Sequence, residues 1–111
     1  MVTSGDFDVR SEELPGDAAA LHVRGELDLA TAPRLEEALA GLAANVVVID
    51  LSGCTFLDSA GIRVLVAAAR GLSKTGRSLR LVTSDPGVVR LLEITGVDTL
   101  IGVHPSLDDA I

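Results

Sequence analysis

The chain has 111 residues, of which 48% are hydrophobic, and its only aromatic side chains are Phe7 and Phe56. This length predicts a single domain, residues 1–111, whose aliphatic core buries roughly two-thirds of the surface of the unfolded chain. The formal net charge of −7 disfavours binding to nucleic acid or to an anionic membrane, and the lone Cys54 excludes an internal disulfide.

The first elements in chain order are predicted to be two strands. We expect a short strand over residues 6–10, with Phe7 and Val9 on one face, and a polar turn in the segment SEELPGDAA. A half-buried strand follows over residues 19–24, because Leu21 and Val23 alternate with polar residues.

The segment GELDLATAP is predicted to be a loop that ends in helix-start signals. Thr31 is suited to cap the helix, and Pro33 is tolerated in its first turn. Apolar residues at helical spacing extend this helix toward a stop at Asn45: Leu35, Ala38, Leu39 and Leu42.

The continuous β-branched run VVVIDL, residues 46–51, is typical of a strand covered on both faces. A second helix follows the junction DSAG, residues 58–61. The remaining predicted elements are a strand over 78–83, a helix opened by Asp85-Pro86 and closed by Gly96, a strand over 99–103, and a short C-terminal turn capped by Ser106.

Alternating strands and helices predict an α/β fold. We expect one central, mostly parallel sheet of four to five strands with about four helices and right-handed crossovers. Functional groups in such sheets gather beyond the carboxyl ends of the strands. Residues 25–28 and 54–61 should therefore lie at the same edge of the sheet.

The junction Asp58-Ser59-Ala60-Gly61 holds two good helix-capping residues, although one would suffice. Gly61 costs about 1 kcal/mol relative to Ala inside a helix. Capping leaves Gly61 unexplained, and we expect that some group approaches the backbone closely at this point.

One stripe of the second helix starts at Ser59. At about 100° per residue, Arg63, Val66 and Arg70 fall on the same stripe, and we expect it to be exposed. Two interpretations have equal weight on the angles alone: a solvated face with one stray valine, or a ridge that binds a partner.

Catalytic and cofactor patterns are missing from the sequence. Ser59 lacks the Gly-x-Ser-x-Gly pattern of a nucleophile elbow, and neither His22 nor His104 is on a loop expected beside it. Asp50 at a strand end suggests a phospho-acceptor of a receiver domain, but the other receiver residues are not in place. No phosphate-binding loop or metal-ligand spacing is present, so we expect no enzyme activity, no cofactor and no metal.

The segments LHVRGELDLATAPRLEEAL and VVVIDLSGCTFLDSAGIRVLVAAAR resemble the STAS domain in its anti-sigma factor antagonist form. SDPGVVRLLEITGVDTLIGVHPSLDDAI is similar to the last part of the same family, so the resemblance covers nearly the whole chain. The chain departs from the family at Ala60, where a second small residue is often serine, and in its short last helix.

The resemblance implies a regulatory binding protein. In the family, the serine at the position of Ser59 is phosphorylated by the anti-sigma factor, which is an ATP-dependent serine kinase. The unphosphorylated form binds this kinase and frees a sigma factor, and the phosphorylated form is released. A phosphatase that acts on Ser59 is a further expected partner. The expected partner-binding residues are Asp28, Asp58, Ser59, Gly61, Arg63, Val66 and Arg70.

A different interpretation keeps the same family but changes the role. The chain would then be a STAS module that senses a nucleotide, or an accessory domain of a transporter or larger regulator. The length and the intact Asp58-Ser59 pair favour the antagonist. An acidic, polar N-terminus unlike a signal peptide, and no apolar run near 20 residues, predict a cytoplasmic protein without a membrane span.

Overall fold

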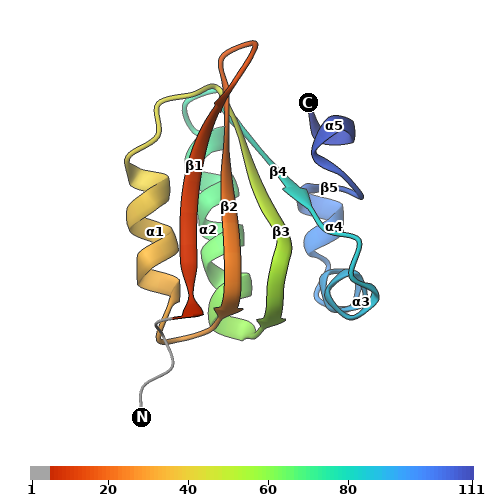
Figure 1. Ribbon diagram of the computed structural model, residues 1–111. Helices are drawn as coiled ribbons and strands as arrows, with labels where there is room; N and C mark the ends of the chain where they lie inside the picture. Colours follow the sequence, from red (N-terminus) through yellow and green to blue (C-terminus); the bar gives the residue numbers. More distant parts are fainter. Residues whose placement is uncertain (1–5) are drawn as a thin grey trace.

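The computed structural model describes residues 6–111 and contains one five-stranded sheet in the order β1-β2-β3-β4-β5 (Figure 1). β1 pairs with β2 antiparallel, and the other pairs are parallel. The strands are β1 (Asp8–Leu14), β2 (Ala18–Leu27), β3 (Val46–Leu57), β4 (Ser78–Val82) and β5 (Gly102–His104). The helices are α1 (Ala32–Ala40), α2 (Ser59–Ser73), α3 (Pro86–Ile94), α4 (Val97–Leu100) and α5 (Leu107–Ala110). The predicted α/β class and mostly parallel sheet are confirmed.

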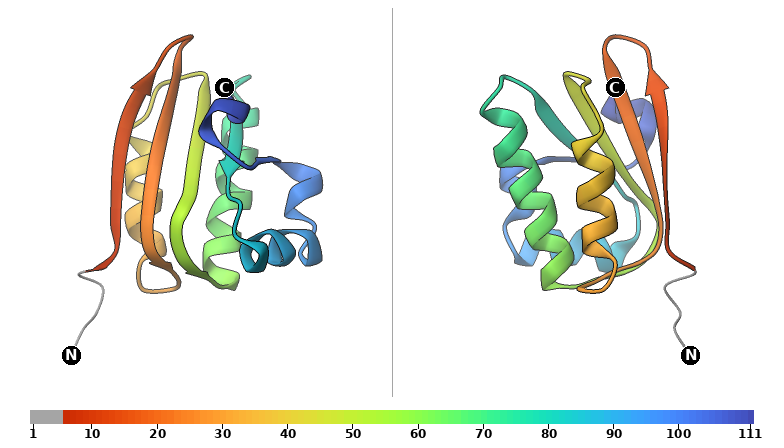
Figure 2. Two further views of the ribbon diagram at one scale, coloured as in Figure 1. Left: turned by 45° about the vertical axis from the view of Figure 1, so that its right-hand side comes forward. Right: turned by 90° about the vertical axis from the view of Figure 1, so that its left-hand side faces the viewer.

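Strand order decides which face of the sheet the helices cover. From β2 onward the chain moves across the sheet in one direction, so right-handed crossovers place the connecting helices on one face. α1 and α2 lie side by side on that face (Figure 2). Their apolar sides and the sheet enclose the main core, which contains Leu21, Val23, Leu35, Ile49, Leu51 and Leu65.

The opposite face of the sheet is covered only in part. Ala20, Val48 and Val82 alternate with main-core residues and form a second cluster with Ala110 of α5. The guanidinium of Arg80 donates a hydrogen bond of 2.6 Å to the carbonyl oxygen of Ala110, which fixes α5 on this face. The prediction that residues 46–51 are covered on both faces is therefore confirmed for the part of β3 beneath α5.

Several element bounds differ from the sequence predictions. β1 continues through Ser11–Leu14, so the turn is only Pro15, Gly16 and Asp17. The polar residues of this extension were predicted to be a turn. They are compatible with a strand because β1 is an edge strand with one exposed face. Residues 97–100 form α4, which takes up the first two residues of the strand expected over 99–103, and β5 begins only at Gly102.

β2 also extends further than predicted, because Gly25, Glu26 and Leu27 belong to the strand and not to a loop. Gly25 has φ +99°, and a Cβ there would lie 2.9 Å from the carbonyl oxygen of Asp6. Glycine is therefore needed where the backbone of Asp6 and Phe7 lies close to β2. The glycine was mistaken for the end of the strand.

Candidate functional site

The ends of β2 and β3 bring the two predicted loops together. Leu27 and Leu57 are register partners in adjacent parallel strands, and the amide of Asp58 donates to the carbonyl oxygen of Leu27 at 3.3 Å. Asp28 and Asp58 therefore follow neighbouring strand ends, at the lower edge in Figure 1. The prediction that residues 25–28 and 54–61 share one edge of the sheet is confirmed.

Asp58 caps α2, as expected. Its Oδ1 accepts hydrogen bonds from the amides of Ala60 at 2.9 Å and Gly61 at 3.1 Å. Ser59 is the first residue of the helix and is exposed. Within the described part of the chain, its hydroxyl has no hydrogen-bond partner. The aspartate thus performs the capping and leaves the serine hydroxyl available to solvent.

The group that approaches Gly61 closely belongs to the chain itself. Gly61 is buried, and a Cβ there would lie 2.9 Å from the carbonyl oxygen of Leu27 and 2.5 Å from Cδ1 of Leu57. The glycine lets the first turn of α2 pack directly on the ends of β2 and β3. Gly61 lies below the surface that Ser59 presents, and its predicted place among the partner-binding residues stays a prediction.

Asp28 shapes the loop between β2 and α1. Its Oδ1 accepts hydrogen bonds from the amides of Ala30 at 3.0 Å and Thr31 at 3.1 Å. Thr31 occupies the N-cap position but makes no side-chain cap, because its hydroxyl donates to the carbonyl oxygen of Glu26 at 2.7 Å. The predicted Thr31 cap is therefore wrong, and Asp28 binds the amides of this turn instead.

The predicted stripe on α2 is only partly exposed. Ser59, Arg63 and Arg70 are exposed, whereas Val66 is half-buried and packs against the main core. The expectation of an exposed valine is wrong because the apolar face of α2 is wider than the angular argument assumed.

Sequence reasoning missed an apolar feature beside Ser59. Leu29, in the loop that Asp28 shapes, is 75% exposed. It borders a shallow groove of about 250 Å³ between α1 and α2, whose lining includes Ala32, Pro33, Ala60, Arg63 and Ala67. The sequence signal for it was a leucine in GELDLATAP, a segment that was predicted to be a loop.

A second polar group lies on the face of the sheet away from α1 and α2. His22 of β2 bonds through Nδ1 to Asp50 of β3 and through Nε2 to Glu12 of β1, both at 2.7 Å. The hydrogen bond to Glu12, reinforced by Asp50, raises the pKa of His22 against the opposing effect of burial. Burial alone would raise the pKa of Asp50, but hydrogen bonds from Ser52 and the contact with His22 outweigh it and lower that pKa.

Cys54 is a small buried residue of β3. It is 4% exposed, and burial raises the pKa of its thiol, which donates to the carbonyl oxygen of Phe56 at 3.1 Å. Among residues 6–111, no group of three or more His, Cys, Asp or Glu side chains is arranged to hold a metal ion. No helix in that range has the length and apolar character that crossing a membrane requires.

The fold and the edge site define a small α/β domain with an exposed serine at a helix start. The chain belongs to the STAS domain family, whose match covers residues 9–110. It is 36% identical to the anti-sigma-F factor antagonist RsfB of Mycobacterium tuberculosis, over 84% of this chain and 78% of that protein. It is 32% identical to the anti-sigma-B factor antagonist of Listeria monocytogenes, over 88% and 89%. The crystal structure of an anti-sigma factor antagonist from Mycobacterium paratuberculosis superposes with a TM-score of 0.88 at 31% identity, covering 99% of this chain and 95% of that one.

Proposed function

We propose that this chain is an anti-sigma factor antagonist that works by partner switching. The unphosphorylated form binds an anti-sigma factor serine kinase in the cytoplasm and so frees a sigma factor. Phosphorylation of Ser59 abolishes this binding, and a phosphatase restores it. Residues 1–111 act as one STAS unit without catalytic activity of their own. Relatives that are named as antagonists and match most of the chain support this role over that of a nucleotide sensor or transporter accessory domain.

The observation that carries the proposal is the exposed hydroxyl of Ser59, which has no hydrogen-bond partner among residues 6–111. A kinase can reach this oxygen without unfolding the helix. Asp58 already binds the amides of Ala60 and Gly61, so a phosphate on Ser59 finds these two donors occupied. The phosphate would gain roughly 0.3–1 kcal/mol from the helix dipole and lose a similar amount to repulsion from the Asp58 carboxylate.

The proposed partner surface combines the predicted residues with the feature that the sequence did not reveal. It comprises Ser59, Arg63 and Arg70 on α2 and the loop that Asp28 and Leu29 form. Asp58 and Val66 support it from half-buried positions. A dianion at Ser59 would be desolvated when the partner covers this surface, and burying a charge without a partner costs several kcal/mol.

Phosphate mapping after incubation with the anti-sigma kinase and ATP tests the site. We expect phosphate on Ser59, none on Ser59→Ala, and normal phosphorylation of Ser52→Ala, a matched exposed serine on β3. Phosphate on any other residue would refute the assignment. ATP with the purified chain alone should give no turnover and no autophosphorylation.

Melting curves and partner affinity of the unmodified and phosphorylated forms test the mechanism. We expect a change in the free energy of unfolding below about 1 kcal/mol, which is a few degrees in melting temperature. Affinity for the anti-sigma factor should fall at least about tenfold. Ser59→Asp, with less charge, should weaken binding less than the phosphate. A phosphorylated form that melts much lower, or that binds equally well, would rule out an electrostatic switch at the surface.

A further inference from the structure

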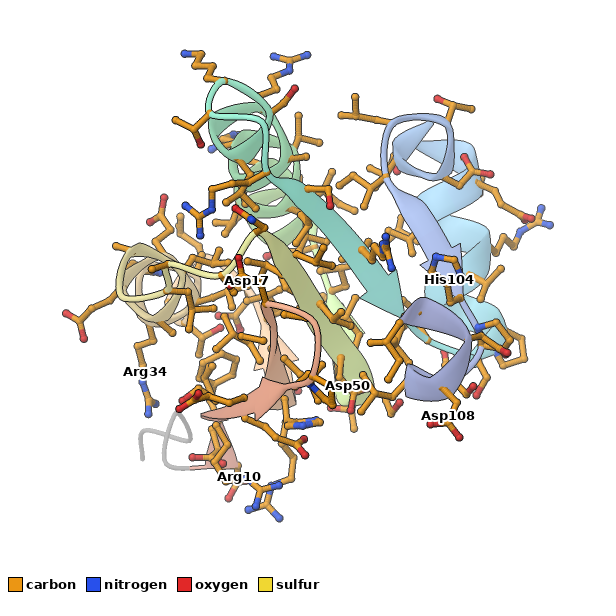
Figure 3. The ribbon with its side chains drawn as sticks, turned by 90° about the horizontal axis from the view of Figure 1, so that it is seen from above. Arg10, Asp17, Arg34, Asp50, His104 and Asp108 are labelled. Atoms are coloured by element: carbon orange, nitrogen blue, oxygen red, sulfur yellow. The ribbon has the colours of Figure 1, made fainter. Side chains whose placement is uncertain are left out.

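A cleft lies on the open face of the sheet, away from Ser59 and the α1–α2 groove. It has a volume of about 440 Å³ and spans β1, β2 and β3 beside the part that α5 covers. Figure 3 shows Arg10 and Asp50 on the side of the sheet that faces away from α2. The residues that line the cleft are Asp8, Arg10, His22, Val23, Arg24, Asp50 and Gly53.

Two arginines on adjacent strands converge on this cleft. Arg10 is the register partner of His22, and Asp8 is the partner of Arg24, so the two arginines are diagonal neighbours on one face. Both are exposed, and within the described residues neither guanidinium has a hydrogen-bond or ion-pair partner. Two like charges at this spacing repel each other unless an anion lies between them.

The neighbouring carboxylates are mostly engaged elsewhere. Glu12 and Asp50 bind the two ring nitrogens of His22, each at 2.7 Å. Both carboxylates therefore interact with the imidazole and not with the arginines. Asp8 is the carboxylate of the lining without an ion pair in the described part of the chain, although it faces Arg24 across the strands. Counting partners among residues 6–111 only, the cleft therefore presents two guanidinium groups without an ion pair and one carboxylate without an ion pair.

The backbone beside Arg24 is irregular in a way that makes room for its side chain. The register of β2 and β3 shifts between His22 and Arg24, and Gly53 faces Arg24 across that shift. A Cβ at Gly53 would lie 3.3 Å from Cγ of Arg24 and 3.2 Å from the carbonyl oxygen of Val23. The missing side chain lets the stem of Arg24 lie against β3. Such irregularities are frequent where a strand must aim a side chain at a site.

We propose that this cleft binds a small oxyanion, a phosphate or carboxylate group, between the guanidinium groups of Arg10 and Arg24. Guanidinium groups bind such anions in a bidentate manner that lysine cannot reproduce. The lining contains two arginines and two aspartates, so its charge is nearly balanced. Such a cleft suits a compact anion that contacts both arginines better than it suits an extended polyanion. This site is independent of Ser59 and of the proposed antagonist role.

Amide chemical shifts of the full chain, followed during titration, test the proposal. The probes are inorganic phosphate, a nucleoside monophosphate and glutamate, each against sodium chloride of equal ionic strength. Saturable shifts confined to residues 8–10, 22–24 and 53 are expected with at least one probe. Saturation by all three probes indicates a general oxyanion site, and saturation by the nucleotide alone indicates that the phosphate arrives on a nucleotide.

Variants assign the effect to the two arginines. Arg10→Gln with Arg24→Gln should weaken binding at least about tenfold. Arg24→Lys should weaken binding less than the double substitution, because lysine keeps the positive charge and loses only the bidentate geometry of the guanidinium. Arg90→Gln, an exposed arginine on α3, is the control for net charge and should bind as the wild type does. Unchanged melting temperatures verify the fold of each variant. The proposal is overturned if no probe gives saturable shifts, or if the shifts persist in the double glutamine variant.

Discussion

Asp28 and Asp58 occupy equivalent places after two neighbouring strands, and each carboxylate binds two backbone amides of the turn that follows. Substitution of either residue would therefore change loop geometry as well as charge. In each aspartate Oδ1 makes both of these hydrogen bonds, so the same oxygen holds the turn in both loops.

Gly61→Ala tests the close packing at the start of α2. Alanine favours a helix by about 1 kcal/mol over glycine, but here its Cβ would meet the carbonyl oxygen of Leu27 at 2.9 Å. We expect a net loss of about 1–3 kcal/mol in the free energy of unfolding, measured by urea denaturation. Gly71→Ala in the same helix is the matched control, because outside its own helix turn a Cβ there would meet no atom of residues 6–111 within 4 Å. It should stabilise the chain by up to about 1 kcal/mol. Stabilisation of both variants would show that the contact with Leu27 is not a constraint.

At the scale of elements, the sequence predicted what depends on local pattern and failed where an element depends on its neighbours. The β-branched run at 46–51 was sufficient to place the first half of β3, which continues to Leu57, and the Asp58 cap was sufficient to place the start of α2. The ends of β1 and β2 could not be placed from the sequence. An edge strand such as β1 tolerates polar residues, and Gly25 is a glycine because the backbone of Asp6 lies close to it, not because β2 ends there. The burial of Val66 and the exposure of Leu29 follow from how α1 and α2 pack together. The angular position of a residue in a single helix carries no information about that packing.

The loop between β2 and α1 provides the sharper test of the partner surface. Leu29→Ala should reduce affinity for the anti-sigma factor by about 1–3 kcal/mol, because an exposed leucine beside a groove is suited to fill a partner's pocket. Its melting temperature should not change, since Leu29 is 75% exposed. Ile94→Ala on α3, 69% exposed, is the matched control and should bind normally. Val66→Asp would be a less informative variant, because Val66 packs on the core and its change would also destabilise the fold.

Equal binding by the Leu29 and Ile94 variants would move the interface away from the α1–α2 groove. Arg63→Glu then decides whether α2 contributes at all, because Arg63 is exposed and lines the same groove. A variant that binds and melts like the wild type would exclude the Ser59 stripe as a contact surface.

At the scale of the whole molecule, two polar regions lie on different parts of the sheet. Its carboxyl edge presents Ser59, and its open face carries the Glu12–His22–Asp50 network that joins β1, β2 and β3. Asp8, Arg10 and Arg24 face the same cleft. The network crosses the antiparallel and the parallel strand pairs, so its protonation state bears on how firmly the edge strand β1 is held.

The stability of the fold should therefore depend on pH through His22. Its pKa is raised in the folded state, chiefly by the hydrogen bond to Glu12, so the folded chain holds this proton more tightly than the unfolded chain. The stabilisation is fully present below the unfolded value of about 6.5 and is lost as the pH rises through the folded pKa. The free energy of unfolding, measured by urea denaturation across this range, should fall with rising pH in the wild type and lose that slope in His22→Gln. The variant His104→Gln, which changes the other histidine, should keep that slope.

The effect should be modest, because 53% of the Glu12 side chain is exposed to solvent. The lowered pKa of Asp50 acts in the acid range instead, where its contribution is lost as the pH falls. A wild-type curve that is flat or rising across neutral pH, or a His22→Gln curve identical to the wild type, would show that the network does not stabilise the sheet.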